Sequence, residues 1–256
     1  MQILTLEEIS VHDYCNKFKG LKEQLGFQLI QLDFQILYPE KVNNLMLNWV
    51  LVKNHLIKIL KTIKLQPEDK TLLSLISTLP QEHQDAVLVH LLIYIVPTAE
   101  IKKPQKRKRT TTTENQVPED TQVKKSLNDK RESYMLVIPV SNEEDATLDR
   151  LKVTLLSKKL TLQPIFVVVG SLLNVQKVYA VIDDTWFECT SVLQSVDFTF
   201  KAFYSLKCAY PVETYNVWNF IQRAFFEIRP TGEKVSIKTR TLEKQIDNLL
   251  KELKTT

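Results

Sequence analysis

The feature that most constrains the fold is a break in the apolar pattern after Pro97. Residues 99–131 carry ten basic and five acidic side chains and show neither helical nor strand periodicity. A segment of this composition buries too little apolar surface to offset the entropy lost on ordering. We therefore predict a basic, disordered linker at 99–131, between a helical module at 1–98 and an α+β module at 132–256.

The residues before this break predict a small helical bundle. Thr5 opens a helix with the spacing of a capping box. Apolar residues at three- and four-residue steps predict a long helix over 42–63. Helices over 67–80 and 81–95 follow, bounded by prolines. Phe27–Tyr38 is apolar without a clear period, so we expect a loop or short extended segment there.

The second module predicts an α+β fold, in which a small antiparallel sheet packs with aromatic-rich helices. Pro164–Gly170 is an unbroken β-branched run, which is typical of a buried strand. Val178–Asp183 and Thr185–Cys189 continue it as an antiparallel meander with a tight turn. Tyr134–Val140 is strand-like or the entry to a helix, and Lys234–Lys238 is a short strand-like piece before a charged terminal helix.

The aromatic residues between 203 and 226 recur at helical spacing, which predicts core positions. Pro211 is a favoured first residue for the helix that contains Trp218. We expect the face of this helix that bears Trp218 to pack against the strand Ile165–Val169. A base-stacking surface would need more interleaved basic residues than these helices carry.

The cysteines and the amino terminus bear on the compartment. Cys15, Cys189 and Cys208 form neither a disulfide framework nor a CxxC pair, which favours a reducing compartment. The first residues lack the basic and apolar regions of a signal peptide. The longest apolar run, Ala86–Val96, is well short of the roughly 20 residues that span a membrane. We expect no membrane association.

Asp183 and Asp184, after a predicted strand, are the one motif that suggests catalysis. Acids at a strand end hold Mg²⁺ in ribonuclease-H-like nucleases and transposases. Asp is also favoured in hairpin turns because its side chain bonds to the backbone, and no second acid pair follows a strand. Glu213 and Asp247 are further candidates without a pattern. We predict no catalytic residue and no cofactor.

The histidines do not predict a metal site either. None of the four, His12, His55, His83 and His90, forms an HxxxH pair, and only His12 lies near a cysteine. His90 lies inside an apolar run, so we expect a core histidine with one satisfied nitrogen.

A cluster of basic residues within 102–109 is the most specific signal in the chain. Its members are Lys102, Lys103, Lys106, Arg107, Lys108 and Arg109. The acidic groove of a nuclear import receptor binds such clusters in disordered segments. The same charge also suits a solvated linker or a tether to RNA or DNA. We predict that the cluster directs nuclear import.

Charge is concentrated in the predicted linker. The chain has a net charge of +4, and residues 99–131 alone contribute +5. The modules are therefore close to neutral, which argues against a broad phosphate-binding face on either. Lysines do lie on or beside the polar side of the predicted helix over 42–63, at Lys53, Lys58, Lys61 and Lys64. Such a helix can bind a membrane surface or a protein, but a core helix with a solvated lysine face has the same pattern.

One resemblance covers roughly residues 75–228. The shared order is an apolar strand ending in VG, a hairpin, an aromatic F-x-x-F segment and a helix led by Y-P. The residues that carry it are Val169, Gly170, Val181, Ile182, Asp183, Phe200, Phe203, Tyr210, Pro211, Phe220, Ile221 and Gln222, together with the run HQDAVLVHLLIYIVP before the linker. This order is similar to that of a multicopy group of uncharacterised insect and fish proteins. The resemblance implies descent from a mobile element and implies no activity.

We therefore expect a non-enzymatic nuclear protein-interaction protein, an adaptor or scaffold, that is also present in the cytoplasm. Its partners would be other proteins and an import receptor. One alternative is a nucleic-acid-binding protein that uses the basic linker and the predicted helix over 42–63 with its lysines, which we name the lysine helix. A second alternative is a metal-dependent nuclease-like domain with Asp183 and Asp184.

Overall fold

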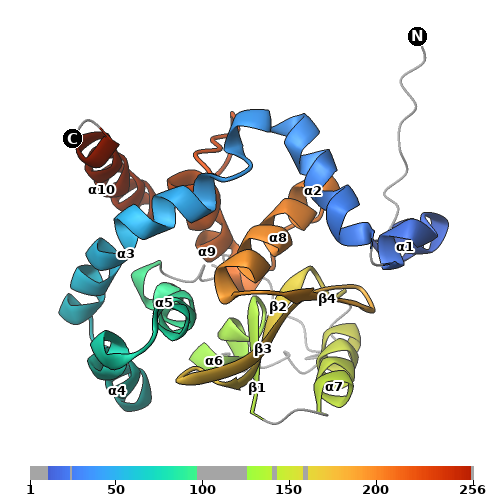
Figure 1. The fold of residues 1–256 in the computed structure, drawn as a ribbon, viewed down its shortest axis with the longest axis horizontal. Helices are drawn as coiled ribbons and strands as arrows, with labels where there is room; N and C mark the ends of the chain where they lie inside the picture. Colours follow the sequence, from blue (N-terminus) through green and yellow to red (C-terminus); the bar gives the residue numbers. More distant parts are fainter. Residues whose placement is uncertain (1–10, 24, 97–125, 140–142, 158–160, 255–256) are drawn as a thin grey trace, which may run out of the picture.

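The computed structural model of the chain describes residues 11–23, 25–96, 126–139, 143–157 and 161–254. Its elements form an α+β fold with one four-stranded mixed sheet and helices on both faces (Figure 1). The fold class predicted from the sequence is confirmed. The helix start at Thr5 and residues 99–125 of the predicted linker lie outside the described residues. Residues 127–131, the end of that linker, form a helix in which Arg131 is buried, so the prediction of a disordered linker is wrong there.

Helices fill the chain before residue 97. They are α1 (Val11–Lys17), η1 (Lys19–Lys22), α2 (Gly26–Leu37), η2 (Pro39–Lys41), α3 (Asn44–Thr62), α4 (Pro67–Leu75), η3 (Ile76–Thr78) and α5 (Gln81–Ile95). The predicted helices over 42–63, 67–80 and 81–95 are confirmed. α5 is buried on every side between Asp85 and Ile93, as its apolar composition requires.

The prediction of a loop at Phe27–Tyr38 is wrong, because this segment forms α2. One face of α2 packs on a helix of the second half, with Ile30 and Phe34 buried. Its opposite face is also apolar, so no single stripe marks the helix in the sequence. Gly26 allows the close approach at its start, since a Cβ there would lie 2.1 Å from the carbonyl oxygen of Leu21.

The second half contains the sheet. Its elements are α6 (Leu127–Arg131), β1 (Met135–Ile138), α7 (Glu144–Ser157), β2 (Ile165–Ser171), β3 (Asn174–Ile182), β4 (Thr185–Cys189), α8 (Val192–Ser205), η4 (Val212–Thr214), α9 (Tyr215–Phe220), the π-helical turn η5 (Ile221–Phe225) and α10 (Ile237–Lys254). Lys234–Lys238 is not a strand, so that prediction is wrong. Instead, the Ser236 hydroxyl accepts a hydrogen bond from the Thr239 backbone N–H (3.1 Å) at the start of α10.

The strand order is β1-β2-β3-β4. The antiparallel meander of β2, β3 and β4 is confirmed, but β1 pairs with β2 in parallel, so the prediction of a purely antiparallel sheet is wrong at β1. Parallel neighbours need a crossover connection, and α7 lies between β1 and β2 in the chain and supplies it.

The sheet separates two apolar clusters. Alternate β2 residues face opposite sides, so Ile165 and Val167 pack with Leu148 of α7, whereas Phe166 and Val168 join the larger cluster, which also contains Phe200 of α8. The packing of the Trp218 helix on this strand is confirmed. The Trp218 ring is fully buried, with the Phe166 ring 6.3 Å away edge-on.

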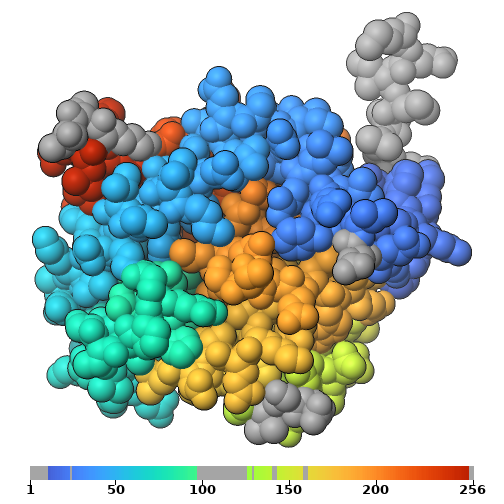
Figure 2. Space-filling view, viewed as in Figure 1, coloured from blue at the N-terminus to red at the C-terminus, as the bar shows by residue number. Residues whose placement is uncertain are grey.

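The larger cluster contains side chains from both halves of the chain. Phe34 of α2, for example, meets the rings of Phe200 and Phe226 at 6.0 and 5.7 Å. Figure 2 shows the blue residues of the first half lying against the orange residues of the second. The ranges 1–98 and 132–256 therefore describe the order of elements along the chain, while their described side chains share one core.

Among the described residues, no helix combines the length and the apolar character needed to cross a membrane.

Candidate functional site

The Asp183–Asp184 motif forms the two-residue turn of the β3–β4 hairpin, closed by the pair of Ile182 and Thr185. Asp183 has a φ of 57°, which Asp tolerates better than most residues because its short side chain can bond locally. The turn interpretation of this motif therefore holds.

Three cationic or potentially cationic groups surround the two carboxylates. The Asp183 carboxylate accepts a hydrogen bond from His12 Nδ1 of α1 (2.9 Å) and lies 3.6 Å from Lys22 Nζ. Asp184 pairs with Lys152 of α7, and this hydrogen bond is the main cause that holds the pKa of the Asp184 carboxyl below its usual value. We name this set, His12, Lys22, Lys152, Asp183 and Asp184, the turn cluster.

The turn cluster contains a group of metal-ligand type. Ligand atoms of His12, Asp183 and Asp184 lie within 4.8 Å of one another, and among the described residues this is the group that could hold a metal ion. The lysines oppose that use, because each places a positive charge on one of the two carboxylates. A metal cation would have to displace both ion pairs and the His12 hydrogen bond. The geometry therefore fits a turn stabilised by ion pairs better than a metal centre.

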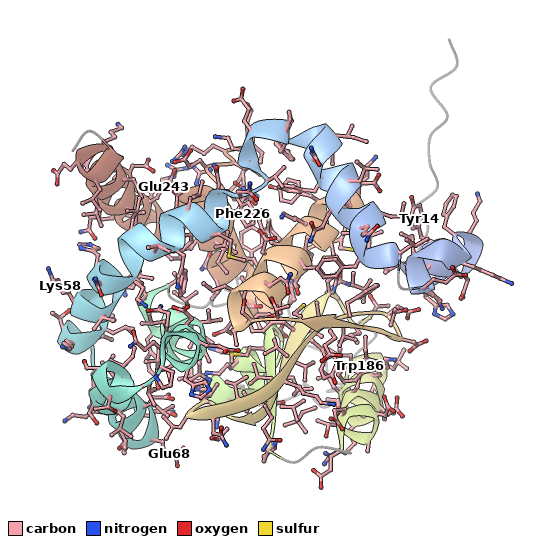
Figure 3. All side chains as sticks on the ribbon, in the orientation of Figure 1. Tyr14, Lys58, Glu68, Trp186, Phe226 and Glu243 are labelled. Atoms are coloured by element: carbon pink, nitrogen blue, oxygen red, sulfur yellow. The ribbon has the colours of Figure 1, made fainter. Side chains whose placement is uncertain are left out.

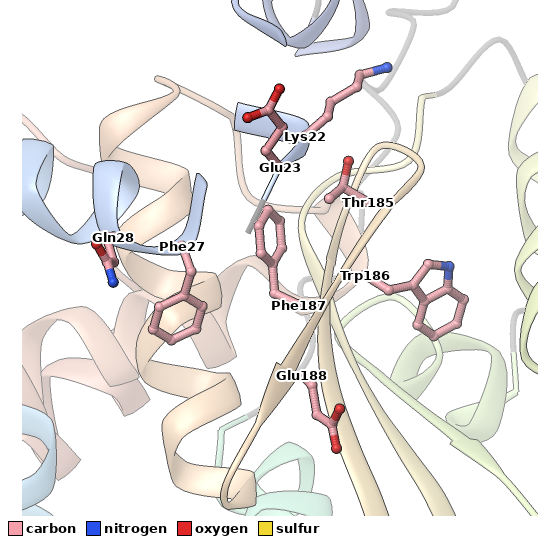
Figure 4. A pocket seen from close by; sticks show the side chains of 8 residues that line it. All are labelled: Lys22, Glu23, Phe27, Gln28, Thr185, Trp186, Phe187 and Glu188. Atoms are coloured by element: carbon pink, nitrogen blue, oxygen red, sulfur yellow. The ribbon is translucent and has the colours of Figure 1, made fainter. Parts of the chain in front are cut away.

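A groove of about 470 Å³ adjoins the turn cluster and shares Lys22 with it. Figure 4 shows Phe27 of α2 and Phe187 of β4 facing this groove, with Trp186 pointing to the other side of the strand. Trp186 packs instead towards α7, edge-on to Tyr179 at 5.5 Å (Figure 3). The groove is therefore open and partly apolar, with charged groups at its rim.

A second polar group joins α4, α5 and α6. The Asp69 carboxylate of α4 accepts hydrogen bonds from Tyr94 Oη (2.5 Å), His90 Nε2 (3.0 Å) and Arg131 Nη2 (2.9 Å). We name these residues the buried cluster. Arg131 follows residues 97–125 in the chain while the other three precede them, so the cluster joins the two halves. The side chains of Asp69, His90 and Arg131 are too buried for a substrate to reach.

The pKa values follow from this burial. Burial alone would raise the pKa of Asp69, but hydrogen bonds from His90 and Tyr94 and the charge of Arg131 hold it well below its usual range. Burial also lowers the pKa of His90, more than its bond to Asp69 raises it. His90 Nδ1 is buried without a hydrogen-bond partner among the described residues. The expectation of a core histidine with one satisfied nitrogen is confirmed.

The cysteines do not provide a thiolate at neutral pH. Burial raises the pKa of the Cys189 and Cys208 thiols to about 12. Cys15 lies near the turn cluster, and burial first, then the charge of Asp183, raises its pKa as well. The thiolate is the nucleophilic form, so these raised pKa values lower the nucleophilicity of the three side chains.

The other residues singled out in the sequence are separated. Lys53 of the lysine helix is buried, with Nζ 3.6 Å from Asp85, whereas the remaining lysines of that helix are exposed; Figure 3 shows Lys58 at the edge of the molecule. Asp247 accepts a hydrogen bond from Arg229 (2.7 Å), and Glu213 lies in η4. The import cluster, Lys102 to Arg109, lies outside the described residues.

The most distinctive surface is an exposed apolar row on α2. Leu25, Leu29, Leu32 and Ile36 are 58, 41, 52 and 71% exposed. Leu25 directly precedes the helix and already bonds in helical fashion, with its carbonyl accepting from the Leu29 N–H (3.0 Å). We name these four residues the α2 seam. Figure 2 shows the blue residues of α2 at the outer surface of the molecule.

The spacing of the α2 seam is that of a helix-pairing surface. Its steps of four, three and four residues are those of the a and d positions of a heptad, which in coiled coils meet another helix. Sequence reasoning missed this seam because Phe27, Ile30 and Phe34 add a second apolar face that hides the heptad. A separate count of each helical face would have found it.

The geometry thus defines an α+β protein with an exposed apolar helix seam. No protein-family model, curated protein or solved structure matches the chain.

Proposed function

We propose that the chain is a non-enzymatic protein-interaction protein, an adaptor or scaffold, that acts in the nucleus. The observation that carries the proposal is the α2 seam, in which four apolar side chains are 41–71% exposed on one face of a helix. Exposed apolar patches rimmed by polar residues are characteristic of protein-binding surfaces. Heptad spacing makes a helix the natural partner, since apolar side chains at these positions interlock with those of a facing helix.

Two seam substitutions test this proposal. Leu32→Lys/Ile36→Lys places charge in the seam without disturbing the buried face of α2, because both side chains point to solvent. A matched control is Val153→Lys/Leu156→Lys on α7, where both side chains are 66% exposed. Affinity purification from cell extract should recover proteins with the wild type and the control that the seam variant loses. Identical recoveries for all three would contradict the proposal.

Nuclear action is proposed from the import cluster alone. Replacing Lys106, Arg107, Lys108 and Arg109 with Ala should shift the full-length protein from the nucleus to the cytoplasm, because an import receptor binds the clustered charge. Imaging of the tagged chain measures this. Unchanged nuclear accumulation, or a cytoplasmic wild type, would reject it. Descent from a mobile element is proposed on the same footing, from the resemblance of residues 75–228.

A metal-dependent nuclease is the second candidate, and the meeting of His12 with Asp183 and Asp184 favours it. The ion pairs with Lys22 and Lys152 count against it. A DNA cleavage assay with Mg²⁺ decides, because cleavage that Asp184→Asn abolishes would support a metal centre. The nucleic-acid-binding alternative predicts binding to random DNA with a steep salt dependence, which phosphate contacts impose.

A further inference from the structure

The α2 seam has a symmetry that a second copy of the chain matches. Its spacing of four, three and four residues is the same when the helix is read backwards. A second α2, antiparallel and related by a two-fold axis between Ile30 and Gln31, would place Leu25 against Ile36 of the second copy and Leu29 against Leu32 of the second copy. Every apolar side chain of the seam would then meet another apolar side chain. This is the self-complementarity that a two-fold interface requires.

The flanks of the seam allow this pairing. Gln28 and Gln35 border it on one side and carry no charge, and Asp33 is the acidic residue on the other side. In the antiparallel arrangement the two Asp33 residues lie about 7 Å apart along the helix axes, from a rise of 1.5 Å per residue. Both stay at the solvated rim, where repulsion is screened. Like charges therefore do not oppose a second copy.

The size of the seam sets the strength of association. Four side chains at these exposures present on the order of 300 Å² of apolar surface, within the range of binding patches on monomers. A standard interface takes about 800 Å² from each partner, much of it polar rim. The seam would supply the apolar centre of a modest interface.

We infer that the α2 seam binds a second copy of this chain, as an antiparallel helix pair about a two-fold axis. The inference rests on the proposed function, since it names the partner of the same surface. The pairing removes the exposed seam from water.

Sedimentation velocity of the purified full-length chain over a range from about 1 to about 200 μM, an interval that covers weak association, tests the pairing. The wild type should shift from monomer to dimer. Leu32→Lys/Ile36→Lys should weaken the dimer at least about 30-fold, as loss of central anchors does. Val153→Lys/Leu156→Lys should dimerise like the wild type. Circular dichroism confirms that both variants are folded.

Cysteine cross-linking tests the orientation. Leu25→Cys and Ile36→Cys are each made singly, and the two proteins are oxidised separately and as a mixture. In the antiparallel pair, equal residues lie about 16 Å apart along the axes, beyond the roughly 7 Å limit between Cα atoms of a disulfide. Only the mixture should form a disulfide dimer. A disulfide dimer formed by either single variant oxidised alone would overturn the antiparallel arrangement. The wild type, with Cys15 and Cys189 buried and Cys208 partly so, is the control for the native thiols.

The failures of the two proposals are distinguishable. A wild type that stays monomeric overturns the inference, and the extract experiment then still reports on the seam through other proteins. A dimer unaffected by the seam variant also overturns it, because the contact would lie elsewhere. If the seam variant loses neither the dimer nor any recovered protein, both proposals fail.

Discussion

The buried cluster and the turn cluster each contain an aspartate in contact with a histidine and a cation. In the buried cluster, the side chains of Asp69, His90 and Arg131 are 5, 10 and 7% exposed. In the turn cluster, the side chains of Asp183, His12 and Lys22 are 14, 56 and 29% exposed. The contacts of the histidines are almost equal, at 3.0 and 2.9 Å. The groups therefore differ mainly in their access to water.

This difference determines what each group can do. In the buried cluster the side chains of Asp69, His90 and Arg131 are almost out of water, so removal of one leaves the charge of another uncompensated. In the turn cluster water replaces a lost partner at little cost. The buried cluster therefore stabilises the contact between the two halves, whereas we expect the turn cluster to be changed without loss of the fold.

The largest expected loss of stability comes from removing a charge of the buried cluster. Arg131→Met removes the cation from Asp69 and leaves a carboxylate that is only 5% exposed. Loss of one partner of a buried pair costs about 3–5 kcal/mol, a large share of the roughly 5–15 kcal/mol that stabilises a domain. Urea unfolding followed by circular dichroism measures it.

Two further variants sharpen this comparison. Lys22→Met makes the same change in the turn cluster and should cost at most about 1 kcal/mol, because exposed pairs contribute little. Asp69→Asn combined with Arg131→Met should recover part of the loss, since the buried charge is then absent. Equal costs for the two single variants would show that burial does not separate the clusters.

The buried cluster also shows where sequence reasoning ends. His90 is predictable as a core histidine, because apolar residues surround it in the chain. Its partner is not, since Asp69 lies 21 residues from His90 in sequence. Arg131, which also bonds Asp69, lies 62 residues from it, and only tertiary packing brings the three together. The same holds for His12 at the Asp183 turn, across 171 residues.

The sequence analysis missed the parallel pairing of β1 and the α2 seam for different reasons. β1 was predicted without its parallel pairing, although the helix between two strand-like runs is the sign of a crossover. That signal was present in the sequence. In α2, two apolar faces blur each other, so a pattern search for one stripe finds none. Local sequence patterns therefore predict the meander, the hairpin turn and the long helices. They do not predict which element packs against each face of a helix or strand.

The next effect is a pH dependence that belongs to the buried cluster. Burial lowers the pKa of His90 in the folded protein below its ordinary value of 6.5. The unfolded chain therefore binds a proton at this site more readily than the folded chain just below pH 6.5, and stability is lost as the pH falls through this window. Asp69 adds a loss in the same direction at more acidic pH, because its folded pKa is also depressed.

His90→Gln isolates the contribution of the histidine. Gln keeps a donor for Asp69 but does not titrate, so the variant should lose less stability than the wild type between pH 7.5 and pH 5, a window close to the unperturbed pKa of about 6.5 for histidine. Urea midpoints at the two pH values give the difference. Parallel changes in the two proteins would mean that His90 is protonated equally in both states.

The smallest effect is expected at the turn cluster. Asp183→Asn removes the charge that His12 and Lys22 contact, but Asn also adopts the positive φ that this turn needs. Unfolding should change by no more than about 1 kcal/mol, because the lost pairs are solvated. Asp183→Ala should cost roughly 1–2 kcal/mol more than Asp183→Asn, since Ala pays the left-handed strain without a local hydrogen bond. If Asp183→Asn were as costly as Arg131→Met, the exposed group would be as tightly coupled to the fold as the buried one. Water access would then not explain the difference between the two clusters.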